Sequence, residues 1–572
     1  MQGMNKELVV LTIAGLDWPS FLERSRDGGV PALAALARRG AFGPVRPSGS
    51  DAPLADWATL ATGRWPEHHR LFRSEETWSG GLRPTGRASW GAAPVWDWLG
   101  SAGVATAVSA FPATTPGAAW RGLHLDDRIA EPTGRTRDDW ALLPRCAPAA
   151  LRDAIRDIRV HPTDISGHML LPLIPALATV DQSRDHRVAQ TALAMAAAAT
   201  DQALANLLLD VGGWRAGFFH QNWLGRMRDL FDRADAPFDL AVDGAWRFLD
   251  AVTGHLIARA GPDCTIVIVS PGYGGAAGVL IAAGPNIAAG TSIGTVDPVD
   301  VAPTLLARFG LRAADLPGTP IGSLSGAPQR DAPPPPAIVP PAPDPDLTSA
   351  LAAAGYPPLT PPPSRWRRDG LVRLAKIVFA RSPAAAGHLT DQALAIDPAD
   401  PTALSIRAAA HVALQEIDAL PALADALTSI APQRSWGPLV RGAYHALRED
   451  RGAATPWLRA AEDAATADGE VETLVRVGAA WLVLKAARDA SRILTKAVAL
   501  DPAHAGARLG LSVAALGCRD IVGAEVAARH VLARNPVDVA AWLQLAQVLR
   551  TAGRSAEAER AESAAARIGL PA

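Results

Sequence analysis

Short apolar runs alternate with helix-like segments through the first part of the chain. The runs LVVLTIAG, VATAVSAF and TIVIVS and residues 278–283 are apolar and are followed by turn-forming residues, which is typical of buried strands. Between them, residues 31–39, 93–101 and 299–311 have the spacing of apolar positions that predicts helices. This alternation predicts a doubly wound, mostly parallel α/β sheet, with its chemistry at the carboxyl ends of the strands.

The pattern changes after residue 325. Residues 326–365 contain PPPPAIVPPAPDPD and PPLTPPP, and neither a helix nor a sheet can accommodate so much proline, so this segment is predicted to be an extended linker. Residues 366–572 are rich in Ala and Leu and form paired amphipathic patterns, such as VAAWLQLAQVLRTAG followed by SAEAERAESAAARIG. The chain therefore divides into an α/β domain over residues 1–325, a linker and an all-α domain.

The all-α segment repeats itself about every 34 residues. Prolines recur one or two such units apart, at Pro398, Pro432, Pro502 and Pro536. Small residues recur at the same interval, at Ala490, Ala524 and Ala558, with Ala422 two intervals before Ala490. This pattern resembles the tetratricopeptide repeat, and the resemblance implies a solenoid of about five helix pairs with a groove for a protein or peptide partner.

Composition narrows the class of protein. The 572 residues carry 55 Lys and Arg against 57 Asp and Glu, a net charge of −2, which favours neither nucleic acid nor an anionic membrane as the partner. The three cysteines, Cys146, Cys264 and Cys518, are far apart and indicate a reducing compartment. No apolar run is long and uncharged enough to predict a membrane span, so we expect a cytoplasmic protein.

Several strings in residues 1–325 together resemble the type I phosphodiesterase and nucleotide pyrophosphatase family of the alkaline phosphatase superfamily. They include GLD at 15–17, WATLATGRWPEHH at 57–69, APVWDWLGSAGVATAVSAFPATTP at 93–116, TIVIVSPGYG and GVLIAAGPNI. The resemblance implies an alkaline-phosphatase-like fold. In active relatives it also implies two divalent cations, usually zinc, which are held by Asp and His ligands and ionise a Ser or Thr nucleophile.

Most positions of that machinery carry other residues here. Asp17 matches the first metal-ligating aspartate of the family, whereas Pro53 occupies the nucleophile position, with Ser48 and Ser50 nearby. The Asp and the His four residues later become Gly225 and Asp229, or Leu224 and Arg228 one register earlier. The Asp and His after the strong strand become Pro271 and Gly272, and the short turn that follows has no His. These departures from the family's pattern thus predict no dizinc site and no cofactor.

Other interpretations of single residues stay open. Asp17 is either a vestigial metal ligand or a helix cap before Pro19, and Asp229, Asp56 or His220 would have to rebuild any active site. His69 is expected to be a structural hydrogen-bonding residue, and the turn arginines Arg64, Arg70 and Arg73 are either solvated or an anion site. The backbone amides of residues 272–275 offer a second place for an anion.

The preferred interpretation is a pseudoenzyme whose helical repeats bind a protein or peptide, because fold and function are separable. One alternative is a metal-dependent phosphoric ester hydrolase with a rebuilt site. The other is a metal-free sensor of a phosphate ligand.

Overall fold

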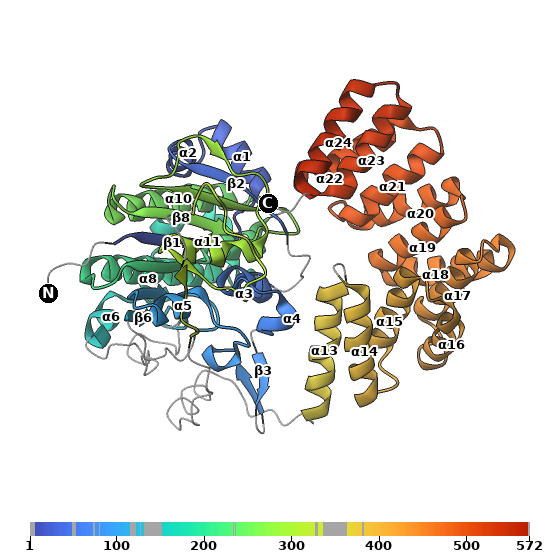
Figure 1. The fold of residues 1–572 in the computed structure, drawn as a ribbon, viewed down its shortest axis with the longest axis horizontal. Helices are drawn as coiled ribbons and strands as arrows, with labels where there is room; N and C mark the ends of the chain where they lie inside the picture. The colour runs from blue at the N-terminus through green and yellow to red at the C-terminus, as the bar shows by residue number, and fades with distance from the viewer. Residues whose placement is uncertain are drawn as a thin grey trace. The chain divides into compact units, whose positions relative to one another are not determined.

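A computed structural model describes most of the chain. The described residues are 6–47, 53–71, 75–78, 81–114, 122–125, 127–130, 151–232, 234, 236–325, 330–335, 363–379 and 382–569. The chain forms two compact units, residues 1–360 and 361–571 (Figure 1). Most of the predicted linker lies outside the described residues, and the first helix of the second unit begins at Pro363.

The first unit is built on an eight-stranded sheet. Its order is β10 (Thr291–Ser292), β2 (Ala41–Val45), β9 (Gly278–Ala283), β8 (Thr265–Ser270), β1 (Leu8–Ile13), β7 (Ala216–Gln221), β5 (Thr106–Ser109) and β6 (Gly122–Leu125). The strands from β8 to β6 are parallel, whereas β9 is antiparallel to both β8 and β2. The prediction of a mostly parallel sheet is confirmed, with β9 as the antiparallel strand that makes the sheet mixed. Strand β9 runs antiparallel to β8 because the seven-residue turn between them is too short for the crossover that a parallel pair needs.

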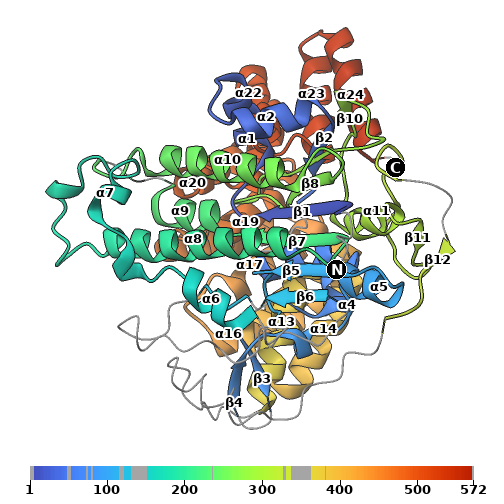
Figure 2. The same ribbon diagram turned by 90° about the vertical axis from the view of Figure 1, so that its left-hand side faces the viewer.

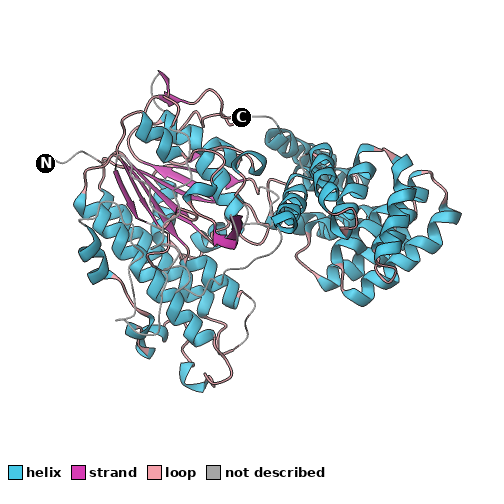
Figure 3. Ribbon diagram, turned by 90° about the horizontal axis from the view of Figure 1, so that it is seen from below, coloured by secondary structure: helices cyan, strands magenta, loops and turns pink. Residues whose placement is uncertain are grey.

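Helices cover both faces of this sheet (Figure 3). One face, seen in Figure 2, is covered by α1 (Trp18–Arg26), α2 (Pro31–Arg38), α6 (Arg152–Ile158), α8 (Arg187–Val211), α9 (Trp223–Phe231) and α10 (Ala241–Ala260). The other is covered by α3 (Pro53–Thr62), α5 (Val95–Ser101) and α11 (Val301–Ala307). Central strand β1 serves both cores, with Val9, Leu11 and Ile13 in one and Leu8 and Val10 in the other, as the two-residue period of a strand requires.

Short elements complete the first unit. They are α4 (Pro66–His69), α7 (Gly167–Leu170), the hairpin β3–β4 (Glu75–Trp78, Gly81–Pro84) and the pair β11–β12 (Leu311–Arg312, Arg330–Asp331). Because β1, β7 and β8 are parallel neighbours, the segments that follow Ile13, Gln221 and Ser270 meet at one edge of the sheet. That edge is where the sequence predicts the chemistry of this fold.

Helix α8 is the one helix in the described part of the chain with the length and apolar composition of a membrane span. Within its most apolar window, 56% is buried inside the protein, and Leu204, Leu208 and Leu209 pack into the core. A core helix of a folded domain passes the same test of length and composition, so α8 gives no clear membrane span.

The second unit is entirely helical. Its described helices are α13 (Pro363–Phe379), α14 (Pro383–Ile396), α15 (Pro401–Leu414), α16 (Leu420–Ile430), α17 (Trp436–Leu447), α18 (Arg451–Asp468), α19 (Val471–Val483), α20 (Ala487–Leu500), α21 (Ala505–Gly517), α22 (Ile521–Arg534), α23 (Val539–Thr551) and α24 (Ser555–Gly569). Consecutive helices pack as pairs, and the first helices of neighbouring pairs also contact each other. These described residues thus form six helix pairs rather than the predicted five.

The register of the repeat needs one correction. The buried residue near the start of each second helix is found at Ala386, Leu420, Ala454, Ala490, Ala524 and Ala558. Every interval in that series is 34 residues except the one that ends at Ala490, which is 36. Counting back two units of 34 from Ala490 therefore gave Ala422, which is exposed, two residues after the true position at Leu420.

Candidate functional site

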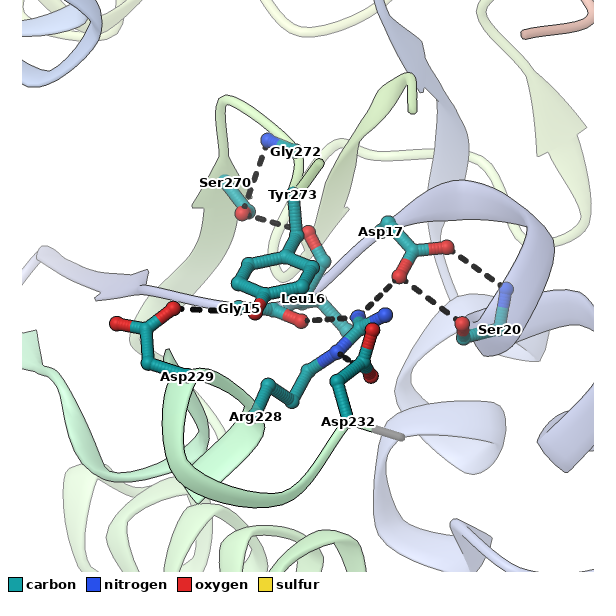
Figure 4. A network of polar contacts seen from close by, with 10 residues as sticks. All are labelled: Gly15, Leu16, Asp17, Ser20, Arg228, Asp229, Asp232, Ser270, Gly272 and Tyr273. Atoms are coloured by element: carbon teal, nitrogen blue, oxygen red, sulfur yellow. Dashed lines mark hydrogen bonds and ion pairs between the residues drawn. The ribbon is translucent and has the colours of Figure 1, made fainter. Parts of the chain in front are cut away.

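Asp17 lies four residues beyond the end of β1 and begins α1. Its side chain is the N-cap of that helix, because its carboxylate accepts hydrogen bonds from the backbone N–H of Ser20 at 3.0 Å and from the Ser20 Oγ at 2.9 Å (Figure 4). The residue is only 2% exposed. A buried carboxylate at this place needs a positive partner, since desolvation of an unpaired charge is costly.

That partner is the guanidinium of Arg228. Its Nη1 forms an ion pair with the Asp17 carboxylate and donates a hydrogen bond to the carbonyl oxygen of Gly15 at 2.8 Å. Its Nε donates to Asp232 at 3.1 Å, and its central carbon lies 4.0 Å from the centre of the Tyr273 ring. Figure 4 shows the guanidinium surrounded by these groups, so the positive charge beside Asp17 is supplied by the protein itself.

Asp229, the next residue, points to a different group. Its carboxylate accepts a hydrogen bond from the Tyr273 hydroxyl at 3.0 Å. Burial, and then the neighbouring Asp229 charge, raise the pKa of the Tyr273 phenol, so it stays protonated and remains a donor. The two carboxylates of Asp17 and Asp229 are thus held by different partners, a guanidinium and a phenol.

The turn after β8 is closed by its own backbone. The Ser270 hydroxyl donates to the carbonyl oxygen of Leu16 at 2.7 Å and accepts the Gly272 N–H at 3.3 Å. Gly272 has φ +108°, and a Cβ built there would lie 2.1 Å from the Ala276 carbonyl oxygen. No side chain fits at 272 in this turn, so the position of the family's histidine is closed by backbone geometry.

Gly225 is in an equally confined place, at the start of α9. A Cβ on Gly15, which has φ +83°, would lie 2.5 Å from the backbone nitrogen of Gly225. The chain after β1 and the first turn of α9 therefore pack backbone against backbone. Asp17, Arg228, Asp229 and Tyr273 converge at this edge, whereas Gly225 contributes only its small size.

The remaining candidate residues lie elsewhere or have structural contacts. Pro53 is the exposed first residue of α3, and Asp56 lies on the same helix. Arg64 pairs with Asp315, and Arg70 is an exposed residue that ends α4. Ser48, Ser50 and Arg73 lie outside the described residues.

His220 is buried at the end of β7. Its Nδ1 lies 2.9 Å from the Thr12 hydroxyl, and its ring meets Trp57 edge-on with the ring centres 4.7 Å apart. Burial lowers the pKa of His220 to about 3, so the imidazole is neutral at ordinary pH. Its contacts are those of a core residue.

His69 is completely buried and holds the turn after α4. Its Nδ1 accepts the N–H of Leu71 at 3.1 Å, so Nε2 carries the proton and donates to the Thr59 hydroxyl at 3.0 Å. The prediction of a structural hydrogen-bonding role for His69 is confirmed.

The donor set does not fit a pair of zinc ions. In the described part of the chain, no three His, Cys, Asp or Glu side chains come together as a metal-binding group. Two adjacent divalent cations need several anionic or imidazole ligands to offset their charge, and here Asp17 is already paired with Arg228.

Fold and site together define a doubly wound α/β domain with a polar cluster at the carboxyl edge of its sheet, followed along the chain by a helical-repeat unit. Residues 8–277, just under half of the chain, match the family model of type I phosphodiesterase / nucleotide pyrophosphatase, so this part of the chain is similar to that family. No curated protein sequence matches the chain.

The helical region has tetratricopeptide-repeat proteins as structural neighbours. One is TTC0263, a thermophilic TPR protein of Thermus thermophilus, with 22% identity over 32% of this chain and 99% of its own length and a TM-score of 0.28. Another is yeast Tom70, with 14% identity over 39% of this chain and 45% of its own length and a TM-score of 0.29. A third is the APC/C hetero-tetramer Cut9-Hcn1, with 13% identity over 36% of this chain and 40% of its own length and a TM-score of 0.31. The chain spans less than half the length of these last two proteins.

Proposed function

We propose that the chain is a catalytically inactive member of its family that acts in the cytoplasm as a scaffold, binding a protein or peptide through its helical repeats. The observation that carries this proposal is the ion pair between Asp17 and Arg228. A guanidinium is part of the chain, stays protonated and has no open coordination position, so it cannot bind and ionise a nucleophile as a metal does.

The surrounding residues support the same conclusion. The nucleophile position is Pro53, which has no hydroxyl, and Asp229 is held by Tyr273 instead of converging with Asp17 on a shared cation. The interpretation as a metal-dependent hydrolase with a rebuilt site needs that convergence. The interpretation as a phosphate sensor needs free amides after β8, and the Gly272 N–H already donates to Ser270.

Binding is the function that remains available to both units. The six helix pairs present a continuous layer of first helices, and stacked helical repeats offer extended surfaces to partner chains. The net charge of −2 gives no bulk attraction to nucleic acid, which favours a protein or peptide partner.

The proposal is tested by measuring metal content and hydrolysis together. Full-length protein purified without chelator is analysed by elemental mass spectrometry and assayed with a bis-nitrophenyl phosphodiester in the presence of Zn²⁺ or Mn²⁺. We expect substoichiometric metal and no turnover above a no-protein control. Stoichiometric metal with turnover that Asp17→Ala abolishes, while an exposed Arg70→Ala control keeps it, would overturn the pseudoenzyme assignment.

A further inference from the structure

Side chains cap the start of α15, α21 and α23, which are first helices of their pairs. Asp400 caps α15 and Asp538 caps α23, and each carboxylate accepts the backbone N–H three residues further on, at 2.8 Å and 2.9 Å. At α21 the same position is His504, whose Nδ1 accepts the N–H of Ala507 at 3.1 Å. The repeat thus places an imidazole where two sister helices use a carboxylate.

The imidazole also contacts the neighbouring helix pair. Its Nε2 lies 3.4 Å from a carboxylate oxygen of Glu472 on α19, and α19 and α21 pack against each other. Since Nδ1 accepts a backbone N–H, Nε2 carries the proton of the neutral ring and directs it at that carboxylate. His504 therefore caps one helix and contacts the next with its two nitrogens, and the neutral ring is sufficient for both contacts.

A protonated ring can keep only one of these contacts. The imidazolium has a proton on both nitrogens, so Nδ1 becomes a donor that faces the Ala507 N–H and can no longer accept it. Its positive charge also lies beside the positive end of the α21 dipole, which is unfavourable. The contact at Nε2 is strengthened, because the charged ring pairs with the Glu472 carboxylate. Proton uptake therefore exchanges the cap of α21 for a stronger contact with α19.

The groups that act on the ring favour proton uptake near neutral pH. The hydrogen bond to Glu472 raises the pKa of His504, and the charges of Glu472 and of Asp501, in the turn before α21, raise it further against the opposing effect of burial. Glu472 also pairs with Arg476 on its own helix, at 3.1 Å. The ring of His504 thus titrates above the ordinary range of a histidine.

Other charged groups on the helices packed against α21 have different partners. His530 on α22 is a second imidazole, but burial, followed by the charges of Arg508 and Arg534, lowers its pKa, so it takes up a proton at lower pH than His504. Arg508 donates to the Pro502 carbonyl oxygen at 2.7 Å. The remaining side chains form ion pairs or lie at the far end of α20: Arg492 and Lys496 with Glu462, Asp489 with Arg451, Arg529 with Glu525, and Arg488 in the first turn of α20.

We propose that His504 is a pH-sensitive cap: proton uptake by its imidazole releases the first turn of α21 while the ring stays paired with Glu472 on α19. Because α21 packs against both α19 and α23, the released turn lies within the last three helix pairs. This inference concerns a regulation of the repeats that goes beyond the proposed scaffold function. It is independent of the metal and turnover measurements that test the pseudoenzyme assignment.

The test is millisecond hydrogen–deuterium exchange of the full-length chain at pH 8 and pH 5.5, corrected for intrinsic exchange rates. The peptide that contains Ala507 should lose about fivefold in protection at the lower pH, since loss of an N-cap changes the stability of a helix end by about that factor. The peptide that contains Ala541 is the internal control. Its cap, Asp538, is a carboxylate that stays ionised at both pH values, so its protection should change less than twofold.

Two substitutions make the test specific. His504→Asp installs the cap that α15 and α23 use, so α21 should stay folded and its protection should no longer depend on pH. Glu472→Gln removes the carboxylate that raises the pKa of His504, so the midpoint of the change should move to lower pH.

Four results would each overturn the proposal. They are a change of less than twofold at the Ala507 peptide of the wild type, a change of equal size at the Ala541 peptide, a wild-type pH dependence in His504→Asp, and an unchanged midpoint in Glu472→Gln.

Discussion

Replacing Arg228 with Met tests whether this arginine supplies the charge that holds the site together. Methionine keeps most of the side-chain length and removes the positive charge from beside Asp17. Breaking a buried ion pair by removing one partner typically costs about 3–5 kcal/mol, because a buried charge is left uncompensated. Asp17 keeps its two hydrogen bonds from Ser20, and the Arg228 side chain is 12% exposed, so we expect the lower end, about 3 kcal/mol.

The double mutant separates the ion pair from other effects of the substitution. Asp17→Asn keeps an oxygen that can cap α1 but removes the negative charge. If Arg228 stabilises the fold through its ion pair with Asp17, Arg228→Met should lower the free energy of unfolding by about 2 kcal/mol less in the Asp17→Asn background than in the wild type. Arg226→Met on the same helix is the matched control, because Arg226 has no ion-pair partner among the described residues.

The assay should report on the first unit alone. Hydrogen–deuterium exchange of peptides covering β1, β7 and β8 gives the opening free energy of this sheet, which belongs to that unit. A loss below about 0.5 kcal/mol for Arg228→Met, or a loss equal to that of the Arg226 control, would refute the reasoning. It would mean that Asp17 is neutralised by another group.

Three further predictions concern single positions. For His220, burial lowers the folded pKa to about 3 against about 6.5 in the unfolded chain, so its stabilisation is present above pH 6.5 and is lost as the pH falls. When hydrogen–deuterium exchange is used to measure stability at pH 7 and pH 5, the wild type should lose about 2 kcal/mol more than His220→Gln over that interval. An equal loss in the two proteins would contradict this. Gly272→His, which restores a family ligand type, should lower the Tm without adding zinc by elemental analysis; a stoichiometric zinc ion would contradict the closed turn. Gly478→Ala should lower the helical melting temperature, because its Cβ would lie 2.6 Å from Leu494 Cγ. The control Gly387→Ala, whose Cβ would make an ordinary contact with Ala410 Cβ at 3.9 Å, should raise it by an amount equivalent to about 0.5–1 kcal/mol.

Four strands of the first unit, β1, β5, β8 and β9, were predictable because each is a buried apolar run, whereas β2, β6, β7 and β10 were not predicted. The run TIVIVS became β8 at Thr265–Ser270, and LVVLTIAG became β1, which ends at Ile13. The direction of β9 was not predictable from its composition, because an apolar run reads the same in both orientations. In the second unit, the period of 34 was visible, but the one interval of 36 shifted the register by two residues and misplaced Ala422.

The departures from the family's ligand pattern were readable from residue types, whereas the charge that stands beside Asp17 was not. Zinc chemistry requires carboxylates and imidazoles, so Pro53 and Gly272 could be recognised as incompatible from the sequence. The partner of Asp17 lies 211 residues away, and its role depends on where the start of α9 places a long flexible side chain. The sequence did contain one signal for this partner. When the family's Asp and His positions are aligned with Leu224 and Arg228, Arg228 stands at the histidine position. A positive side chain opposite a retained carboxylate is a direct substitute for a cation.

The geometry also bears on whether the family's ligands could be placed at these positions. A side chain at 272 meets a carbonyl oxygen at 2.1 Å, and a Cβ at Gly225 would lie 2.8 Å from the Asn222 side-chain oxygen and 3.1 Å from Ala14 Cβ. At 272 a backbone carbonyl occupies the space that a ligand side chain needs, whereas at 225 that space is limited by the Asn222 side chain and by Ala14. A ligand at 272 therefore requires a longer turn after β8, and a ligand at 225 requires Asn222 and Ala14 to shift. Since no single substitution supplies these changes, the structure offers no short route from this site to the family's dizinc arrangement.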